Sequence, residues 1–521
     1  MGLAKIDSGT GQQKTNPVPG INVTISMFFD GTGNNKNNTD ARIAASKISD
    51  KRQEKQTVYE KNTDHQSSSY ENDYSNVARL WKNFTENPSQ NIFKHYVDGM
   101  GTASQKEDDG KGTAVGSGDT GIPNRIKTTC QWMAVTLNNL VRKQRTQVVN
   151  NLTVDVFGFS RGAAAARHFI YEITKAAYKA EVVTTYVPGG EFGGGGETLT
   201  SYKDDMHNPT DFTEFPMRGY LGAYSKNYQL QINNVIIRFV GLFDCVASYN
   251  QGLFLPGMNT DTPSQFKKNT VELHLNAVAL ARKTIHFTAA DEHRGNFPLT
   301  TIASAGNKGQ SFSLPGVHSD VGGCYIDNMN EVEGVIDHST DVAGIEAERE
   351  SIIAQGWYNK DELTINYADD GTSVNELSGH RKSVRNSYSF IPLHFMCRHA
   401  IEFTKKNTPD NIIPFDQAKI ESTQNFTSIE GDKLLEAISA ILEKQVFENG
   451  PPLVFNQQHN STVNNPKSPG VAADVANQQN LRLLRHGYLH WNANYDTVYG
   501  VLHPMFPRLV NNHAERLILP G

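Results

Sequence analysis

Short apolar runs alternate with helical patterns through the first three fifths of the chain. Nearly continuous apolar runs, which are typical of strands buried on both faces, occur at residues 21–29, 152–157 and 235–243, with shorter runs at 93–98 and 311–314. Residues 122–145 repeat apolar side chains at helical spacing, and residues 161–175 include four consecutive alanines, so both predict helices. Strands that alternate with helices predict an α/β fold, with a mostly parallel sheet flanked by helices.

Polar stretches interrupt this alternation. Residues 34–74 are dominated by Asn, Lys, Ser, Asp and Gln, and they cannot bury enough apolar area to fold by themselves. We interpret them as a surface insertion. The glycine-rich residues 188–196 and the Asn-, Gln- and Pro-rich residues 451–480 predict loops.

Beyond residue 325 the apolar pattern becomes helical and less regular. Helices are expected at residues 343–355 and 432–446. One apolar stripe of the second helix is formed by Leu434, Leu435, Ile438, Ile441 and Leu442. Such a stripe is more often a face packed on the core than a lid or a membrane-docking face.

Composition and charge exclude several classes of function. The net charge of the 521 residues is −6 and Lys and Arg are spread thinly, so no nucleic-acid partner is expected. The four cysteines are widely separated and form no CxxC pair, so we expect reduced, buried thiols. The first twenty residues lack the apolar stretch of a secretory signal, and no run approaches the roughly 18 apolar residues of a membrane span. We therefore expect a protein made in the cytoplasm without a signal peptide.

The strongest chemical signal is the sequence Gly158-Phe159-Ser160-Arg161-Gly162, a GxSxG motif between an apolar strand and an alanine-rich helix. In this context the serine occupies a tight strand-to-helix elbow that lifts its hydroxyl out of the sheet. A Cβ on either flanking glycine would crowd that turn. The motif in this context predicts an α/β-hydrolase-type fold with Ser160 as nucleophile.

A serine hydroxyl is a weak nucleophile, so a histidine must accept its proton and an acid must orient that histidine. In this fold the order along the chain is serine, acid, histidine, with the last two on loops after strands. Asp244 follows the apolar run 235–243, and His318 follows residues 311–314 on a turn. We expect these two residues to complete a triad with Ser160, although each also fits a purely structural role.

Other residues fit these roles less well. Asp320 is only two residues from His318 and would have to fold back to reach the imidazole, so we expect it to bond the amides of residues 321–323. Four further histidines, which lie in helical or irregular surroundings, are weaker candidates for the base: His394, His399, His490 and His503.

The negative charge that develops on the substrate oxygen needs two backbone donors. One normally comes from the residue after the serine, here Arg161. The second is expected from the loop after the first strand, at Gly31 and Thr32, where glycines allow close approach of a substrate. A plain tight turn is the alternative for this loop.

Two rival chemistries are weaker. Gly31-x-Gly33 after a strand begins like a dinucleotide-binding fingerprint, but its third glycine falls at Lys36, and the residues that follow are not those expected to begin a packed helix. Metal catalysis lacks an HExxH motif, and His394 and His399 are five residues apart rather than four. No metal and no cofactor are expected.

These patterns divide the chain into three parts. Residues 1–20 are expected to form a flexible N-terminus, and residues 21–330 the α/β-hydrolase-type catalytic domain with surface insertions. Residues 331–521 are expected to form a mainly helical accessory region, serving as a lid or in membrane docking, and partly packed on the catalytic domain.

Several separated blocks resemble the hydrolase domain of the first family of bacterial type VI secretion lipase effectors. The blocks are FFDGTGNN, SNVARL, YVDGMGT, GFSRGAAAAR, GLFDCVAS, ADEHRGNF and PGVHSDVGGCY, which occupy residues 28–35, 75–80, 96–102, 158–167, 241–248, 290–297 and 315–325. They keep their order through roughly the first three fifths of the chain. The catalytic residues of that family fall on Ser160, Asp244 and His318, although Phe243 stands where the family usually has Trp.

The resemblance implies a type A serine phospholipase that hydrolyses acyl esters of membrane glycerophospholipids. It further implies an antibacterial effector delivered by the type VI apparatus into the periplasm of target bacteria. The expected partners are the membrane phospholipid, a cognate immunity protein and a secretion spike or carrier protein. The same machinery would also serve an esterase or thioesterase acting on a soluble acyl substrate, and the fold alone would serve a binding protein without activity.

Overall fold

The structure is a computed structural model that describes residues 20–46, 69–109, 116, 118–187, 197–247, 273–369, 371–427, 433–453, 475–493, 495–496, 509–510, 513–514 and 516–521. The N-terminus expected to be flexible lies outside the described residues except for residue 20. The loop expected at residues 188–196 also lies outside them, as does most of the loop expected at residues 451–480.

The centre of the protein is a parallel sheet with the strand order β12-β10-β9-β3-β1-β2. Its strands, in chain order, are β1 (Ile21–Phe29), β2 (Ile92–Val97), β3 (Val148–Phe159), β9 (Gln231–Phe243), β10 (Lys283–Ala289) and β12 (Gly309–Leu314). This confirms the predicted α/β fold with a mostly parallel sheet. Only β10 was missed, because its sequence KTIHFTA alternates polar and apolar residues although its side chains are buried or nearly so.

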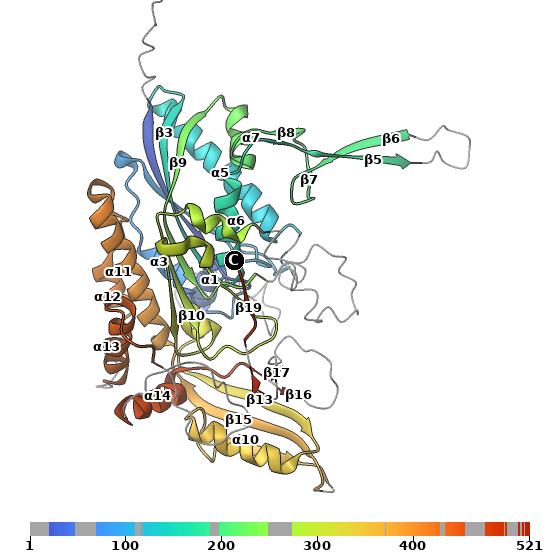
Figure 1. Ribbon diagram of the computed structural model, residues 1–521, viewed down its shortest axis with the longest axis vertical. Helices are drawn as coiled ribbons and strands as arrows, with labels where there is room; N and C mark the ends of the chain where they lie inside the picture. The colour runs from blue at the N-terminus through green and yellow to red at the C-terminus, as the bar shows by residue number, and fades with distance from the viewer. Residues whose placement is uncertain are drawn as a thin grey trace, which may run out of the picture.

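Helices cover both faces of this sheet (Figure 1). On one face lie α5 (Ile122–Lys143) and α6 (Arg161–Glu172), and on the other lie α3 (Asn76–Asn83) and α11 (Phe390–Asn407). Within β1, Ile25 and Met27 pack in the core on the α5/α6 face, whereas Phe28 packs in the core on the α3/α11 face. Burial on both faces explains why these strands are nearly continuous apolar runs.

A buried ion pair inside the sheet ties its central strands to the C-terminal part of the chain. Arg238 on β9 donates from Nε and Nη2 to the carboxylate of Asp155 on β3, at 2.8 and 2.5 Å. Ser26 on β1 donates to the same carboxylate. A further guanidinium N–H of Arg238 donates to the carbonyl of Asn411, just beyond α11. The charge of Arg238, unusual in so apolar a run, is thus fully paired.

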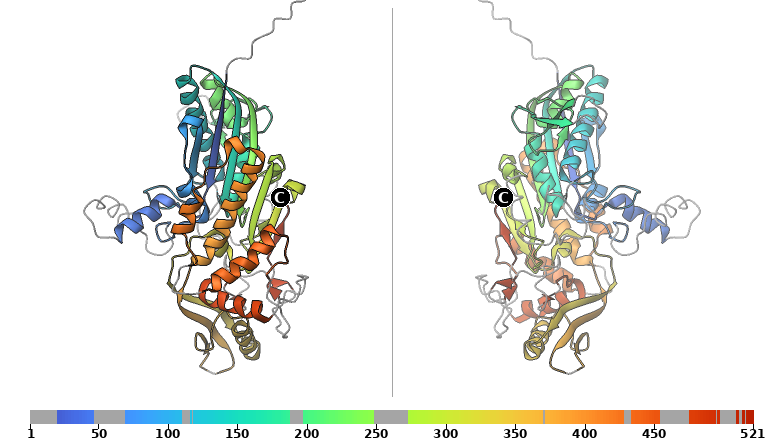
Figure 2. Two further views of the ribbon diagram at one scale, coloured as in Figure 1. Left: turned by 90° about the vertical axis from the view of Figure 1, so that its left-hand side faces the viewer. Right: turned by 90° about the vertical axis from the view of Figure 1, so that its right-hand side faces the viewer.

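The C-terminal part contains the two helices expected at residues 343–355 and 432–446, further helices, and a sheet that the sequence did not predict (Figure 2). The helices are α10 (Val342–Ala354), α11, α12 (Gln417–Thr423), α13 (Leu434–Phe447) and α14 (Val475–Tyr488). The strands of the sheet are β13 (Met329–Ser339), β14 (Leu363–Tyr367), β15 (Val374–Val384) and β16 (Tyr495–Asp496), in the order β14-β15-β13-β16. "Mainly helical" is therefore an incomplete description of residues 331–521. Both α14 and β13 also cross limits drawn from the sequence, since α14 starts inside the stretch 451–480 and β13 spans residue 330.

The stripe on α13 packs on the core, as its pattern predicted. Leu435, Ile438 and Leu442 are buried, and Leu434 and Ile441 pack against the same cluster. That cluster also contains Phe28 and Phe157 of the central sheet. One continuous apolar core therefore joins the C-terminal region to the catalytic part of the chain.

The polar stretch after β1 is only partly a surface insertion. Helix α1 (Lys36–Ala45) begins two residues after Asn34, with Asn35 as its cap, and Asn38 and Thr39 are buried. The side-chain amide of Asn38 donates to Ser69, and that of Asn35 donates to Thr102. A network of polar pairs thus replaces apolar burial here. Our expectation that no packed helix follows Gly31 and Gly33 was therefore wrong. The argument against a dinucleotide-binding site now rests on Lys36 alone, which stands where the fingerprint has its third glycine.

Several short elements complete the fold. A hairpin of β5 (Glu181–Val187) and β6 (Glu197–Lys203) projects from the body of the molecule (Figure 1). The remaining elements used below are α7 (Gly219–Asn227), α9 (His318–Gly322), β11 (Leu299–Thr300) and β19 (Ile518–Leu519). None of the helices in the described parts of the chain has the length and apolarity needed to cross a bilayer.

Candidate active site

Ser160 lies at the sharp turn between β3 and α6. Its backbone has φ 58° and ψ −132°, a strained conformation for a residue with a side chain. Its amide donates to the carbonyl of Phe243 at 3.1 Å, and its carbonyl accepts from the amide of Val246 at 3.3 Å. The turn is therefore bonded on both sides to the segment that carries Asp244. The predicted strand–elbow–helix arrangement is present.

The two glycines of the motif are required by backbone packing. A Cβ on Gly158 would lie 2.6 Å from the Cα of Ala163, and one on Gly162 would lie 2.2 Å from the carbonyl oxygen of Asp30. Both distances are shorter than real contacts of this kind. The loop after β1 therefore lies directly against the elbow, which places residues 30–33 beside Ser160.

Gly162→Ala is expected to destabilise the protein by about 3 kcal/mol or more, because the new methyl group meets backbone atoms that cannot move alone. Chemical denaturation with parallel measurement of ester hydrolysis checks this. The matched control is Gly487→Ala in α14, where an added Cβ meets nothing within 4 Å and stability should be unchanged or slightly higher. Equal stability of the Gly162→Ala variant and the wild type would show that the elbow is not as tight as described.

Asp244 and His318 are in direct contact, 74 residues apart in sequence. Asp244 directly follows β9 and is fully buried, and His318 is the first residue of the short helix α9 rather than part of a plain turn. His318 Nδ1 lies 2.5 Å from Asp244 Oδ2. Because a carboxylate can only accept, Nδ1 carries the proton and Nε2 is left as the basic nitrogen.

Aromatic rings bring the imidazole to the elbow. The ring of His318 lies 4.6 Å from that of Phe159, the residue before the serine, and 5.0 Å from that of Phe297. A Cβ on Gly322 would overlap the ring of Phe159, so α9 packs directly on the end of β3. The described residues show no hydrogen bond from Ser160 Oγ to His318, a contact that in enzymes often tightens only with substrate bound.

The charges of this pair are set by burial and by one arginine. Burial acts to raise the pKa of Asp244, but the guanidinium of Arg516 and the bond from His318 outweigh it and hold that pKa well below its usual range. Burial lowers the pKa of His318 despite the opposing effect of Asp244. At neutral pH the site therefore holds an ionised acid and a neutral imidazole, the combination that general-base catalysis needs.

Asp320 does not lie where we expected. Instead of bonding the amides of residues 321–323, its Oδ2 accepts from the amides of Val317 and His490. Its Oδ1 lies 2.8 Å from Nδ1 of His490. The short helix α9 turns this carboxylate toward its own N-terminus, away from the amides expected. Asp320 therefore has its own imidazole partner, and Asp244 is the acid that contacts His318.

Three residues around the pair were not identified from the sequence. Glu292 accepts from the backbone amide of His318 and from the side chain of Asn492. Arg294 pairs with Glu292 at 2.8 Å. Arg516 pairs with both carboxylate oxygens of Asp244. Glu292 and Arg294 lie in the block ADEHRGNF, which could have drawn attention to them, but Arg516 lies in no recognisable motif.

In the loop expected to supply an oxyanion donor, Gly31 and Thr32 differ in their hydrogen bonding. The amide of Gly31 already donates to the Asp30 carboxyl at 2.8 Å, and the hydroxyl of Tyr96 donates to the same carboxyl at 2.5 Å. Burial raises the pKa of Asp30 to about 6. Among the described residues no acceptor pairs with the Thr32 hydroxyl, which is shielded from solvent. Arg161 is the first residue of α6, where helix amides point toward the serine.

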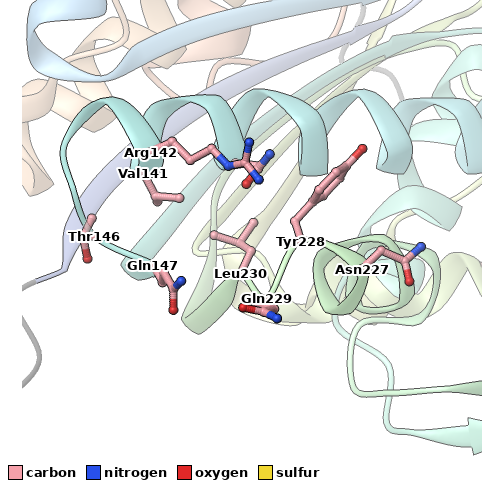
Figure 3. A pocket seen from close by; sticks show the side chains of 9 residues that line it. Val141, Arg142, Thr146, Gln147, Asn227, Tyr228, Gln229 and Leu230 are labelled. Atoms are coloured by element: carbon pink, nitrogen blue, oxygen red, sulfur yellow. The ribbon is translucent and has the colours of Figure 1, made fainter.

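Features away from this site offer no competing centre in the described parts of the chain. A cavity of about 240 Å³ lies between the end of α5 and the segment after α7, lined by Arg142, Gln147 and Tyr228 among others (Figure 3). Its lining includes the residues just before β3 and β9, whereas Ser160 and Asp244 follow the other ends of these strands. No cluster of three or more metal-ligating side chains occurs among the described residues. His394 bonds a backbone carbonyl, His399 stacks on Phe447, and His503 lies outside the described residues.

The sequence profile described as "T6SS, Phospholipase effector Tle1-like, catalytic domain" matches residues 24–345. The chain belongs to the Tle1-like phospholipase effector family. Its matched region contains the GxSxG elbow, Asp244 and His318, and it ends well before Arg516. This membership confirms the family resemblance drawn from the sequence blocks. The chain is thus a member of a family of phospholipase effectors of the type VI secretion system.

One solved structure agrees with the fold of this Tle1-like chain. One similar structure is titled "Structure of the Tle1 effector bound to the VgrG spike from the Type 6 secretion system", with 19% identity, a TM-score of 0.51, and coverage of 100% of this chain and 98% of that one. Another is an uncharacterised protein from Pseudomonas aeruginosa, with 18% identity, a TM-score of 0.31, and coverage of 58% and 42%. No curated protein sequence matches the chain.

Proposed function

We propose that this protein is a type A serine phospholipase that hydrolyses acyl esters of membrane glycerophospholipids with Ser160 as nucleophile. The observation that carries the proposal is a strained GxSxG elbow whose neighbouring segments hold Asp244 and His318 in contact at 2.5 Å. Such an elbow with a buried acid–imidazole pair is the arrangement of acyl transfer. The phospholipase description of the family supports the lipid ester as substrate.

The reaction proceeds through an acyl-enzyme. Ser160 Oγ attacks the ester carbonyl carbon while His318 Nε2 takes the hydroxyl proton, and the carbonyl electron pair moves to the oxygen. Collapse of the tetrahedral intermediate breaks the ester bond, and His318 gives the proton to the leaving lysophospholipid oxygen. Water then attacks the acyl-serine while His318 takes its proton, and His318 returns this proton to Ser160 Oγ as the fatty acid leaves. Asp244 holds the imidazole in the tautomer that each step needs.

The oxyanion is stabilised by the amide of Arg161 and by a donor from Thr32. The supporting observations are that the Gly31 amide is already bonded to Asp30, whereas the Thr32 hydroxyl has no acceptor among the described residues. The loop lies directly against the elbow, since a Cβ added to Gly162 would lie only 2.2 Å from the carbonyl oxygen of Asp30. The positive end of α6 adds to the stabilisation of the negative charge.

The proposed setting of this activity is the periplasm of competing bacteria. The family assignment supports delivery by the type VI apparatus, and the solved relative bound to a VgrG spike supports a spike or carrier protein as partner. A phospholipase of this kind attacks a lipid that its producer also contains. A cognate immunity protein in the producer is therefore part of the proposal.

Expression directed to the periplasm of a susceptible bacterium is expected to be toxic, and expression in its cytoplasm much less so. The reason is that the proposed effector acts on membrane surfaces that face the periplasm, and expression in the cytoplasm does not bring the protein to them. Growth should be followed at matched protein levels, with lysophospholipid and free fatty acid measured in extracted membranes. The control is the same exported protein carrying Ser160→Ala, which should be harmless. Equal toxicity from both compartments, or toxicity of the exported control, would argue against periplasmic phospholipid hydrolysis.

A further inference from the structure

The segment 516–521 lies along β11, which is bonded in turn to the loop that carries the acid. Strand β19 pairs in parallel with β11, the amide of Leu299 donates to the carbonyl of Leu517 at 2.8 Å, and the amide of Thr301 donates to the carbonyl of Leu519 at 3.0 Å. Figure 1 shows β19 running beside the central sheet. These backbone bonds set the register of the segment. Arg516, just before β19, is thereby brought to Asp244, 272 residues away in sequence.

The guanidinium of Arg516 makes a fork-to-fork contact with the carboxylate of Asp244. Nη1 donates to Oδ1 and Nη2 donates to Oδ2, each at 2.7 Å. The remaining bonds fix the guanidinium itself, since Nε donates to the carbonyl of Phe297 at 2.9 Å and Nη1 to that of Ala289 at 3.3 Å. The arginine side chain is 9% exposed and the aspartate side chain is fully buried. Such a desolvated, two-pronged pair is both strong and directional.

We propose that Arg516 is a positioning residue of the active site, which holds the carboxylate of Asp244 in the orientation that His318 requires. This inference rests on the proposed Ser160 mechanism and extends it to a segment outside the region matched by the family profile. Asp244 Oδ2 is shared between His318 Nδ1 and Arg516 Nη2, while Oδ1 is held by Arg516 and by the amide of Ala289. Without the arginine, one backbone bond and the imidazole would remain to orient the carboxylate.

The arginine also affects the charge of the catalytic histidine. Its positive charge holds the pKa of Asp244 below its usual range despite burial. A cation in contact with that carboxylate also offsets part of the attraction between the carboxylate and a protonated His318. Because hydrolysis needs neutral His318, activity falls as pH drops through the pKa of that imidazole. Removing the positive charge of Arg516 strengthens the pull of Asp244 on the proton, so the pKa of His318 rises. The acid limb of the pH–rate profile should then move to higher pH.

Two other charged groups also act on the pKa of His318, which Glu292 raises and Arg294 lowers. Glu292 bonds the backbone amide of His318, and its charge is paired with Arg294. His286, on β10, accepts from the amide of Cys245 through Nε2, and burial lowers its pKa to about 3, so it is neutral. Burial raises the pKa of the Cys245 thiol, which is neutral too. Arg516 is the cation in direct contact with the Asp244 carboxylate among the described residues.

The test compares Arg516→Ala and Arg516→Lys with the wild type in the full chain, using kcat, KM and the pH dependence of kcat/KM on a short-chain soluble ester. For Arg516→Ala we expect kcat to fall about 10- to 100-fold with little change in KM. Its acid limb should move up by about one pH unit. Arg516→Lys keeps the charge but not the fork, so it should retain the wild-type limb and recover part of kcat.

Two controls separate this role from a general loss of structure. Arg398→Ala removes an arginine that pairs with Glu402 and Glu443 on the surface, and it should leave kcat and the acid limb unchanged. Millimolar guanidinium, far below denaturing concentrations, should restore activity to Arg516→Ala and not increase that of the wild type. Thermal unfolding of each variant gives its folded fraction. If Arg516→Ala does not fold, the comparison of kcat with the wild type is made with Arg516→Lys instead.

The outcomes also separate this inference from the mechanism on which it rests. Full activity of Ser160→Ala would overturn the proposed mechanism, and the inference with it. If activity depends on Ser160 but folded Arg516→Ala, or folded Arg516→Lys where the alanine variant does not fold, has wild-type kcat, the inference alone is wrong. A fall in kcat without a shift of the acid limb and without rescue by guanidinium would also overturn it, because that pattern indicates only a structural role.

Discussion

Ser160→Ala is expected to lower phospholipid hydrolysis by at least about 10⁴-fold while leaving the fold intact, because the residues of a nucleophile–base–acid unit fail together. The side chain of Ser160 accepts no helix-capping bond in the structure, so its hydroxyl contributes little to stability. The measurement is release of lysophospholipid and fatty acid from vesicles of defined phospholipids, with a short soluble ester measured in parallel. A rate on vesicles well above that on the soluble ester would separate a phospholipase from a soluble-ester esterase.

His318→Ala should cause a loss of similar size, and the double variant should be little worse than either single variant. Ser422→Ala on the exposed side of α12 is the matched control and should retain the wild-type rate. Wild-type-like hydrolysis by purified Ser160→Ala or His318→Ala would remove the assignment. A strictly additive loss in the double variant would mean that the two residues do not act in one unit.

Asp244→Asn is expected to lower kcat by about 10³- to 10⁴-fold, whereas Asp320→Asn should cost less than about tenfold. An amide in place of the Asp244 carboxylate stabilises the wrong imidazole tautomer, and it turns an N–H group toward the guanidinium of Arg516 or toward His318. Asp320 contacts His490 and the amide of Val317 rather than the catalytic imidazole. Its replacement should therefore act mainly on stability, by about 1 to 3 kcal/mol.

The variants Asp244→Asn and Asp320→Asn are best compared by kcat and by melting temperature on the same preparations, with kcat measured at temperatures where each variant is folded. Asp244→Asn also leaves the buried charge of Arg516 without its partner, so we expect it to be destabilised as well. The discriminating quantity is activity per folded molecule. Loss of catalysis in folded Asp320→Asn together with retention in folded Asp244→Asn would show that the acid is misassigned.

Local signals were sufficient for five of the six strands of the central sheet and for the elbow. Strands buried on both faces appear as uninterrupted apolar runs, and GxSxG between such a run and an alanine-rich helix specifies a particular backbone turn. The order of serine, acid and histidine then singled out Asp244 and His318, which the structure brings into contact. Each of these inferences needs only the sequence within a few residues of the motif, together with a rule for the order of the elements.

What could not be predicted depends on contacts between distant segments. Helix α1 buries asparagines whose partners, such as Ser69 and Thr102, lie tens of residues away, so its sequence looks like a surface insertion. Strands β13 and β15 pair largely with each other and carry polar residues, so they lack the pattern of a buried strand. Arg516 reaches Asp244 only because β19 pairs with β11, and no local motif announces that pairing.

The most direct test of the account is to locate the residue that reacts with a long-chain alkyl fluorophosphonate, with and without competing phospholipid vesicles. Attack by an activated serine displaces fluoride and leaves a stable adduct that peptide mass spectrometry can place. We predict a single adduct on Ser160, formed more slowly when phospholipid vesicles compete and absent after Ser160→Ala or denaturation. An adduct on another residue, or vesicle hydrolysis that persists with Ser160 fully blocked, would contradict the claim that this protein is a serine phospholipase acting through Ser160.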